Sequence, residues 1–171
     1  MSVEVELKIL NINPDEVREK LKELGIETTR IDQKDFVLLL SEREVLRIRE
    51  VNGKVKLTYK FRIEKSKFKV ARETEVLISD FENMRKILER ICKGVPYYQY
   101  VKRREVFEID GVKGEIVELD GLQPFIELEG ERGKILEVIK KLGLENHETS
   151  SEGIPSLLKR AGIFPKILGG E

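Results

Sequence analysis

Apolar and charged residues alternate strictly near the start of this sequence. Residues 3–8 are Val-Glu-Val-Glu-Leu-Lys. Successive side chains of an extended strand point to opposite faces, so Glu4, Glu6 and Lys8 would share one face and the apolar residues the other. Neighbouring carboxylates on that face would lie about 6.6 Å apart, close enough for both to reach one hard cation. On this stretch alone, a surface strand whose charged face meets water is the simpler interpretation.

The same alternation recurs on both sides of Asn52-Gly53, a pair typical of tight hairpin turns. Before the turn, Arg47 and Arg49 share one face. After it, Lys56 and Lys60 share one face. Each strand is apolar on its other face, so the pattern predicts a hairpin with one basic and one apolar side.

Further alternating segments complete a sheet. Strands are expected at about 70–78 and 98–109, and a buried apolar strand at 35–40. Asp-Gly pairs at 110–111 and 120–121 then predict a meander that ends in residues 125–129. The charged residues that alternate on these segments are Glu73 and Glu75, Lys102 and Arg104, and Glu127 and Glu129.

Segments whose apolar residues recur at helical spacing lie between these strands in the sequence. Asn13-Pro14 is typical of a helix start, and Ser79 with Glu82 has the spacing of a capping box. Residues 62–69 are rich in lysine and predict a loop, as do the polar residues 144–153. We find no linker or internal repeat and expect a single domain over residues 1–171. Helices are expected at about 14–24, 81–91, 132–142 and 156–160.

Composition narrows the chemistry. Lysine plus arginine total 32, as do aspartate plus glutamate, so nothing in the net charge favours nucleic acid or anionic lipid as a partner. One cysteine and one histidine exclude a zinc cluster of thiolates or imidazoles, so any metal would be a hard cation such as Mg²⁺ or Mn²⁺. The charged fraction is 37%, and the high lysine and glutamate content with a single cysteine hints at a thermophilic source. Without a signal peptide or long apolar segment, we expect a cytoplasmic protein.

No Gly-rich phosphate loop and no Ser-His-Asp arrangement is present, so phosphates would have to be bound by side chains on strands. If the sheet curls with its charged faces inward, basic groups could bind phosphoryl oxygens while carboxylates hold a metal. The alternative is a sheet whose charged faces meet solvent, with cross-strand ion pairs. Periodicity does not decide between the two. The basic set is Lys8, Arg47, Arg49, Lys56, Lys60, Lys102 and Arg104, and the acidic set is Glu4, Glu6, Glu127 and Glu129.

The residues resemble a known family. Glu4-Val5-Glu6-Leu7-Lys8 is similar to the E-x-E-x-K signature of the CYTH domain family, which includes class IV adenylyl cyclases, thiamine triphosphatases and inorganic triphosphatases. Further matches follow in family order over nearly the whole chain: Leu46-Arg47-Ile48-Arg49, Leu57-Thr58-Tyr59-Lys60, Arg72-Glu73-Thr74-Glu75, Lys102-Arg103-Arg104 and Gly121-Leu122 through Phe125-Ile126-Glu127-Leu128-Glu129.

The resemblance implies an α+β fold, in which a closed eight-stranded antiparallel β-barrel forms a tunnel and helices pack on its outside. It implies that Glu4, Glu6, Glu127 and Glu129 bind Mg²⁺ or Mn²⁺ and that the basic set above binds a triphosphate, with Lys8, Arg49 and Lys60 catalytic. Glu73, Glu75 and Glu118 would be further carboxylates facing the tunnel. The substrate would be ATP, thiamine triphosphate or tripolyphosphate, and the protein a monomer or homodimer.

Two positions depart from the family pattern. An aspartate usually stands ten residues before the first glutamate of the last pair, where this chain has Val117; Glu115, Glu118 or Asp120 would substitute, depending on the register. Val37 stands where cyclase-like members carry a tyrosine. We therefore favour hydrolysis of the triphosphate. A class IV adenylyl cyclase and a non-catalytic module that binds triphosphate or polyphosphate are the alternatives.

Overall fold

Eight antiparallel strands close into a barrel in this computed structural model, which describes residues 2–170 without the side chains of residues 2 and 65. The barrel strands pair in the order β6-β2-β3-β4-β5-β1-β8-β7, and β7 pairs back with β6. This closure confirms the predicted barrel and leaves none of its eight strands at a free edge. The strands are β1 (Ser2–Ile9), β2 (Thr29–Leu39), β3 (Glu44–Val51), β4 (Lys54–Lys65), β5 (Lys69–Ile78), β6 (Pro96–Ile109), β7 (Val112–Glu118) and β8 (Phe125–Glu129).

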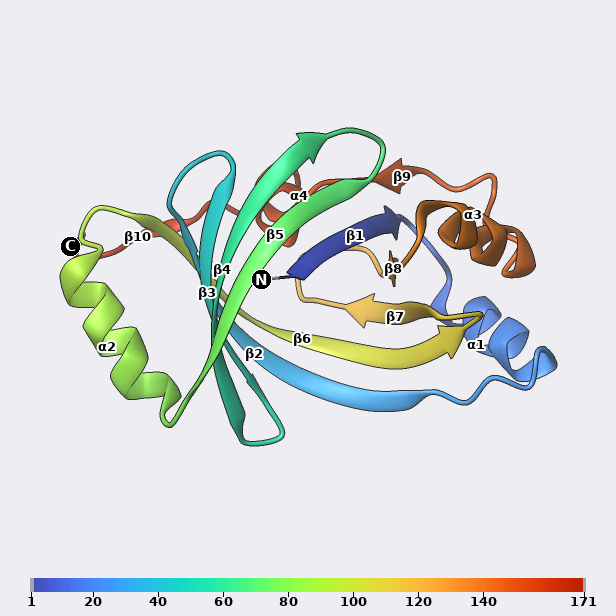
Figure 1. The fold of residues 1–171 in the computed structure, drawn as a ribbon, viewed down its shortest axis with the longest axis horizontal. Helices are drawn as coiled ribbons and strands as arrows, with labels where there is room; N and C mark the ends of the chain where they lie inside the picture. The colour runs from blue at the N-terminus through green and yellow to red at the C-terminus, as the bar shows by residue number, and fades with distance from the viewer. Residues whose placement is uncertain (1, 171) are drawn as a thin grey trace.

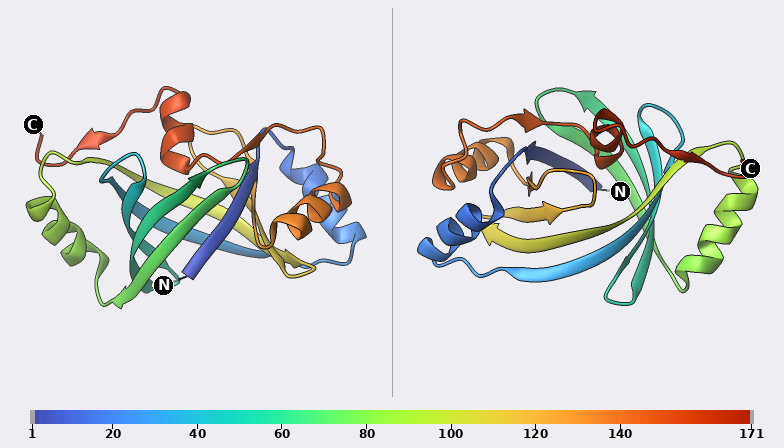
Figure 2. Two further views of the ribbon diagram at one scale, coloured as in Figure 1. Left: turned by 45° about the horizontal axis from the view of Figure 1, so that its top comes forward. Right: turned by 180° about the vertical axis from the view of Figure 1, so that it is seen from behind.

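Helices cover the outside of the barrel (Figures 1 and 2). In Figure 1, α2 (Phe81–Ile91) lies at one side, and α1 (Pro14–Glu23) and α3 (Arg132–Lys141) lie together at the other. A fourth helix, α4 (Ile154–Arg160), lies between two short strands, β9 (Thr149–Ser150) and β10 (Lys166–Ile167). These short strands pair with β1 and β6.

The apolar side chains of the strands face outward, under the helices. Leu7 and Ile126 on the strands pack with Leu21 of α1 and Val138 of α3 in one cluster. Phe36 and Ile48 pack with Phe81 and Leu88 of α2 in a second cluster. Because the apolar faces are covered from outside, the charged faces of the same strands must point into the barrel.

A third cluster closes one end of the barrel interior. Its strand residues continue the inward-facing rows and are apolar, whereas the rows are charged further along. Helix α4 packs on them and so blocks the interior from this end. The cluster contains Leu10, Tyr98, Val117, Leu119, Phe125, Ile154, Leu157 and Leu158.

Tight turns joining the strands agree with the sequence. Asn52 and Gly53 have φ of 49° and 74°, and Asp110 and Gly111 have φ of 53° and 78°. Both pairs therefore adopt the left-handed conformation that a two-residue hairpin turn requires.

The segment 62–69 is not the loop that its lysines predict. Strand β4 continues to residue 65 and β5 begins at Lys69, so residues 66–68 alone connect them. The register shifts between Arg62 and Glu64, which marks a bulge. A bulge inserts an extra residue and breaks the two-residue period, and this hides the strand from a search for alternation.

Other boundaries also differ from the prediction. Strand β2 begins at Thr29 rather than at residue 35, and β9 interrupts the expected loop 144–153. Asp80, not Ser79, is the N-cap of α2 and accepts a hydrogen bond from the backbone N–H of Asn83. Helix α4 starts two residues earlier than expected, at Ile154. Among the residues described, no helix has the length and apolar character needed to cross a membrane.

Candidate active site

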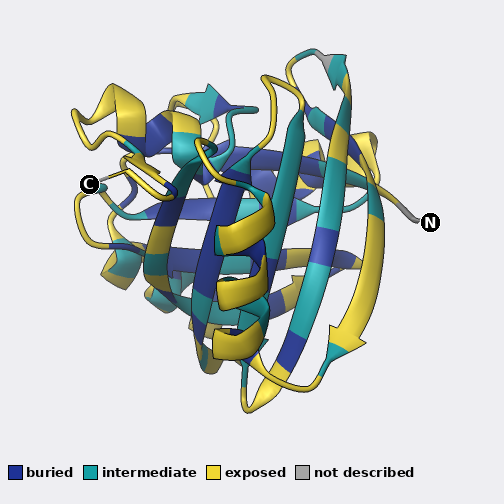
Figure 3. Cartoon of the chain, turned by 90° about the vertical axis from the view of Figure 1, so that its left-hand side faces the viewer, coloured by how far each residue is buried: buried dark blue, intermediate teal, exposed yellow. Residues whose placement is uncertain are grey.

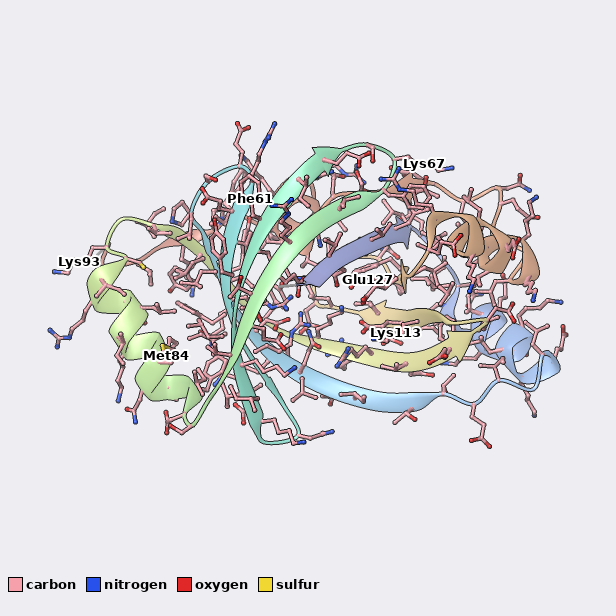
Figure 4. The ribbon with its side chains drawn as sticks, viewed as in Figure 1. Phe61, Lys67, Met84, Lys93, Lys113 and Glu127 are labelled. Atoms are coloured by element: carbon pink, nitrogen blue, oxygen red, sulfur yellow. The ribbon has the colours of Figure 1, made fainter. Side chains whose placement is uncertain are left out.

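The inward faces of the strands enclose a cavity of about 820 Å³. It runs from the charged middle of the barrel to α4 and the loop between β2 and β3. Figure 3 shows the burial of the strands and the helix that covers them, and Figure 4 shows Glu127 and Lys113 within the ring of strands. Every residue of the predicted basic and acidic sets lines this cavity, together with Glu73 and Glu75.

Cationic side chains outnumber anionic ones in the cavity wall. Of the described residues, twelve lysines and arginines and eight glutamates line it, an excess of four positive charges. The whole chain has 32 of each sign, so 20 basic and 24 acidic residues remain elsewhere. The cavity wall is therefore positive, and the remaining residues of the chain are negative in sum. Collecting so many like charges in a buried space is costly unless an anion neutralises them.

Lys8 lies at the centre, with its side chain 2% exposed. Its ammonium contacts Glu6 and lies 3.2 Å from Glu127 Oε2. Burial lowers the pKa of Lys8, but the charges of Glu127 and Glu6 outweigh this and raise it. Lys8 is therefore a fixed cation at neutral pH. The arrangement follows from register, because Lys8 faces Glu127 across the β1–β8 ladder.

A second group of charges lies toward the opposite mouth. Lys60 donates to Glu4 Oε2 at 2.9 Å and also contacts Glu73. Burial and a hydrogen bond to Glu4 raise the pKa of Glu73, whereas the pKa of Glu4 is lowered because Glu73 and Lys60 outweigh its burial. Lys56 donates to Glu75 Oε1 at 2.5 Å. Each of these three carboxylates therefore contacts a lysine.

Asp35 holds Arg49 in place. It is fully buried and accepts from Arg49 Nε at 2.7 Å and from Nη2 at 3.2 Å. Gln33 donates to the same carboxylate at 2.7 Å. Burial raises the pKa of Asp35, but the positive charges of Arg49 and Arg47 more than offset this and hold it below its ordinary value.

We expect the Asp35–Arg49 pair to make stability depend on acid pH. The folded-state pKa of Asp35 is below its unfolded value of about 3.9, so its contribution is complete above that pH and is lost as pH falls toward the folded pKa. Asp35→Asn should therefore cost about 3 kcal/mol at pH 7 and progressively less toward pH 3, measured by urea unfolding. Asp32→Asn, at an exposed site on the same strand, is the control. A cost that stays constant with pH would contradict the assignment.

Two guanidinium nitrogens inside the barrel have no partner. Arg47 Nε and Arg104 Nε are buried, and neither makes a hydrogen bond to any described residue. The pKa of Arg47 is lowered, chiefly by burial and by the neighbouring charge of Arg49. Buried polar atoms are almost always satisfied, so these N–H groups indicate a site for an anion that accepts hydrogen bonds.

The model of the CYTH domain family matches residues 2–153 of this chain. The protein belongs to the CYTH domain family. A Methanocaldococcus jannaschii protein named as a candidate adenylate cyclase is 33% identical over 155 residues, which are 82% of this chain and 87% of the relative.

Solved structures share the fold of this chain. The PH1012 protein of Pyrococcus horikoshii has a TM-score of 0.81 and 23% identity over 90% of this chain and 98% of its own. A candidate adenylyl cyclase of Hippeastrum, whose structure is described as revealing a dominant triphosphatase activity, has a TM-score of 0.66 and 19% identity. That likeness covers 95% of this chain and 96% of the Hippeastrum chain.

CYTH enzymes of the tunnel type generally use divalent metals, and the carboxylates of this tunnel suit a hard cation in their chemistry. Glu6 faces Glu129 and Lys8 faces Glu127 across the β1–β8 ladder, so the pair on β1 and the pair on β8 lie on adjacent strands. Glu129 has a pKa raised by burial and by the charge of Glu4. Among residues 2–170, however, no three acidic, histidine or cysteine side chains converge as a ready metal site. Lysines lie between the carboxylates instead.

This CYTH domain has Val117 where the family usually has an aspartate. Strand register decides which nearby residue faces the cavity instead. Val117 points inward but belongs to the apolar cluster under α4. Glu115, two residues earlier on the same face, lines the cavity and contacts Arg104 and, at 2.9 Å, Lys102. Glu118 is not in the tunnel, contrary to the prediction, because its parity is opposite. It accepts from Arg18 of α1 at 3.0 Å on the outside.

Several tunnel residues are missing from the sequence prediction. Lys69 falls in the segment expected to be a loop, and its signal is hidden by the bulge. Lys113 of the cavity wall and Asp35, the partner of Arg49, share the inward parity of their strands, so the alternation rule could have found them once the strand ends were known. Tyr100 lies on the inward face of β6, two residues before Lys102, and burial raises its pKa.

Replacing Glu115 tests its place among the tunnel cations. Glu115→Gln should lower the free energy of unfolding by about 3 kcal/mol, because Lys102 and Arg104 lose a buried counter-charge. Glu118→Gln is the matched control three residues along the same strand, and it should cost under about 1 kcal/mol because its ion pair is partly exposed. Equal costs in denaturant titrations would show that Glu115 does not stabilise the cationic wall.

Proposed function

We propose that this CYTH domain is a divalent-metal-dependent triphosphatase, which binds a nucleoside or inorganic triphosphate inside the barrel and hydrolyses it. The observation that carries the proposal is the cavity wall, with its excess of four cations and two buried guanidinium N–H groups without partners. A triphosphate supplies the missing negative charge and oxygen acceptors at once.

The residues that would bind the phosphates come from four strands, β1, β3, β4 and β6. Arg47 and Arg104 offer their free N–H groups, and Arg49 is held by Asp35 so that one nitrogen remains for a ligand. Fixed cations in a buried site stabilise the charge that develops on the phosphoryl oxygens during transfer, without reorganising at the moment of reaction. The triphosphate-binding set is Lys8, Arg47, Arg49, Lys56, Lys60, Lys102 and Arg104.

In hydrolysis, a water molecule attacks the terminal phosphorus. The oxygen of water forms the new P–O bond and gives up a proton to solvent, the bridging P–O bond breaks, and the diphosphate leaves with its electron pair. The ammonium groups of Lys8 and Lys60 would stabilise the negative charge of the departing oxygens. Glu4, Glu6, Glu127 and Glu129 would hold Mg²⁺ or Mn²⁺, which supplies further positive charge at the phosphoryl oxygens.

Val37 supports hydrolysis over cyclisation. It lies on the inward face of β2, 2% exposed, opposite Tyr98 of β6. An apolar side chain there gives no group to orient a ribose hydroxyl. The name of the M. jannaschii relative favours the alternative, in which the 3′-oxygen of ATP attacks the α-phosphorus and pyrophosphate leaves. The net negative charge of the residues outside the cavity wall does not favour nucleic acid as a partner.

Product identification separates these activities. The protein is incubated with tripolyphosphate and with ATP, each with Mg²⁺ or Mn²⁺, and followed by phosphorus NMR. Orthophosphate with pyrophosphate or ADP is the expected result. Cyclic AMP with pyrophosphate as sole products from ATP would establish the cyclase instead. Metal-dependent binding without turnover would show a non-catalytic triphosphate-binding module.

A further inference from the structure

Both oxygens of Glu6 are occupied by ammonium groups. Lys8 contacts Oε1, and Lys69 donates to Oε2 at 3.2 Å. Glu6 is 3% exposed, so solvent does not compete for it. A divalent cation cannot bind this carboxylate unless one of the two lysines moves away.

The two lysines are held very differently. Lys8 is 2% exposed in its side chain and lies between two carboxylates, Glu6 and Glu127. Lys69 is 17% exposed and has Glu6 as its one ion-pair partner among the described side chains. Lys69 is therefore the lysine that can leave at the smaller cost.

The position of Lys69 gives it a second destination. It is the first residue of β5, faces Glu6 across the β1–β5 ladder and lines the same cavity as the triphosphate-binding cations. A lysine side chain is long and flexible, so its ammonium can turn from a carboxylate to a phosphoryl oxygen without movement of the strand.

We propose that Lys69 is a resident counter-cation of Glu6 that couples the two ligands of the tunnel: an entering triphosphate draws its ammonium away from Glu6 and so opens that carboxylate to the divalent metal. The inference rests on the proposed function. It predicts that metal binds weakly to the free protein and more tightly after the triphosphate, beyond the attraction between the two ligands themselves. By linkage, the metal strengthens triphosphate binding by the same factor.

Lys69→Met tests the coupling, and Lys113→Met is the matched control. Lys113 lines the same cavity and faces Glu129, but makes no ion pair with Glu6. Both variants remove one positive charge from the tunnel. Mn²⁺ affinity is measured by calorimetry on the full chain, without and with imidotriphosphate, a triphosphate that resists hydrolysis.

Lys69→Met should bind Mn²⁺ about tenfold more tightly than the parent protein when no triphosphate is present, because Glu6 Oε2 is free. The gain in Mn²⁺ affinity caused by imidotriphosphate should shrink by a similar factor. Lys113→Met should change Mn²⁺ affinity by less than about threefold and leave the coupling as it is. Lys69→Gln, which keeps a hydrogen-bond donor, should fall between the two and replaces Lys69→Met if that variant does not fold.

An unchanged Mn²⁺ affinity in the Lys69 variants, or a change equal to that of Lys113→Met, would overturn the inference. Tighter Mn²⁺ binding with undiminished coupling would show that Lys69 blocks Glu6 but does not respond to the triphosphate, which also contradicts it. A parent protein that binds neither imidotriphosphate nor Mn²⁺ refutes the proposed function itself. The Lys69 variants therefore test the coupling, whereas the parent protein tests the proposed function.

Discussion

Arg47→Met is expected to weaken binding of tripolyphosphate by roughly 10- to 100-fold and to stabilise the free protein. The guanidinium is buried, its Nε has no hydrogen bond, and no carboxylate among the described residues is paired with it. A ligand that binds there gains charge-assisted hydrogen bonds, and their loss accounts for the weaker affinity. Removing a buried cation that makes no ion pair with a described residue should add about 1–3 kcal/mol to the free energy of unfolding.

Calorimetric titration and urea unfolding measure these two effects on the same samples. Arg103→Met is the control, since Arg103 is the outward neighbour of the tunnel residues on β6 and pairs with exposed Asp120. It should alter neither quantity beyond a few tenths of a kcal/mol. If Arg47→Met destabilises the free protein and binds tripolyphosphate normally, Arg47 is a structural residue and the anion site lies elsewhere.

The second large effect is expected at Glu127. Glu127→Gln should reduce metal-dependent cleavage of tripolyphosphate by about a thousandfold or more, because a carboxylate of the proposed metal set is lost where two lysines depend on it. Its oxygens lie 3.2 Å from Lys8 Nζ and 3.4 Å from Lys102 Nζ. The charges of Lys102 and Lys8 overcome its burial and hold the pKa of Glu127 low, so it is ionised at neutral pH.

Turnover and Mn²⁺ affinity are measured together for Glu127→Gln, with circular dichroism to check that the barrel forms. Glu108→Gln, at an exposed site on β6, should behave as the parent protein. Retention of Mn²⁺ affinity and turnover in a folded Glu127→Gln protein would remove this residue from the metal set.

Much of the fold follows from residues that alternate in the sequence. Alternation assigns Glu4 and Glu6 to one face of their strand, because a strand places every second side chain on the same side. It assigns Arg47 and Arg49 to one face of theirs in the same way. Closure of the barrel could not be derived in this way, since it depends on β7 meeting β6, and pairing of strands is not visible in a period of two. The family resemblance supplied it.

The remaining errors have two physical causes. A bulge near Arg62 shifts the alternation, so Lys69 was assigned to a loop. The register of β7 decides between Glu115 and Glu118, and only cross-strand pairing with Glu127 fixes it. The ion pairs could not be predicted from the sequence, because the partner of a lysine depends on three-dimensional packing. Arg47 lacks a partner for the same reason, and no pattern in its own strand indicates this.

A crystal structure with imidotriphosphate and Mn²⁺ tests the central claim most directly. We predict phosphoryl oxygens within hydrogen-bond distance of Arg47 Nε and Arg104 Nε, the two buried nitrogens now without partners. The anomalous signal of manganese should place the metal at Glu6 and Glu127, with Lys69 turned away from Glu6. Triphosphate bound on the outer surface, with the barrel interior unchanged, would contradict the account.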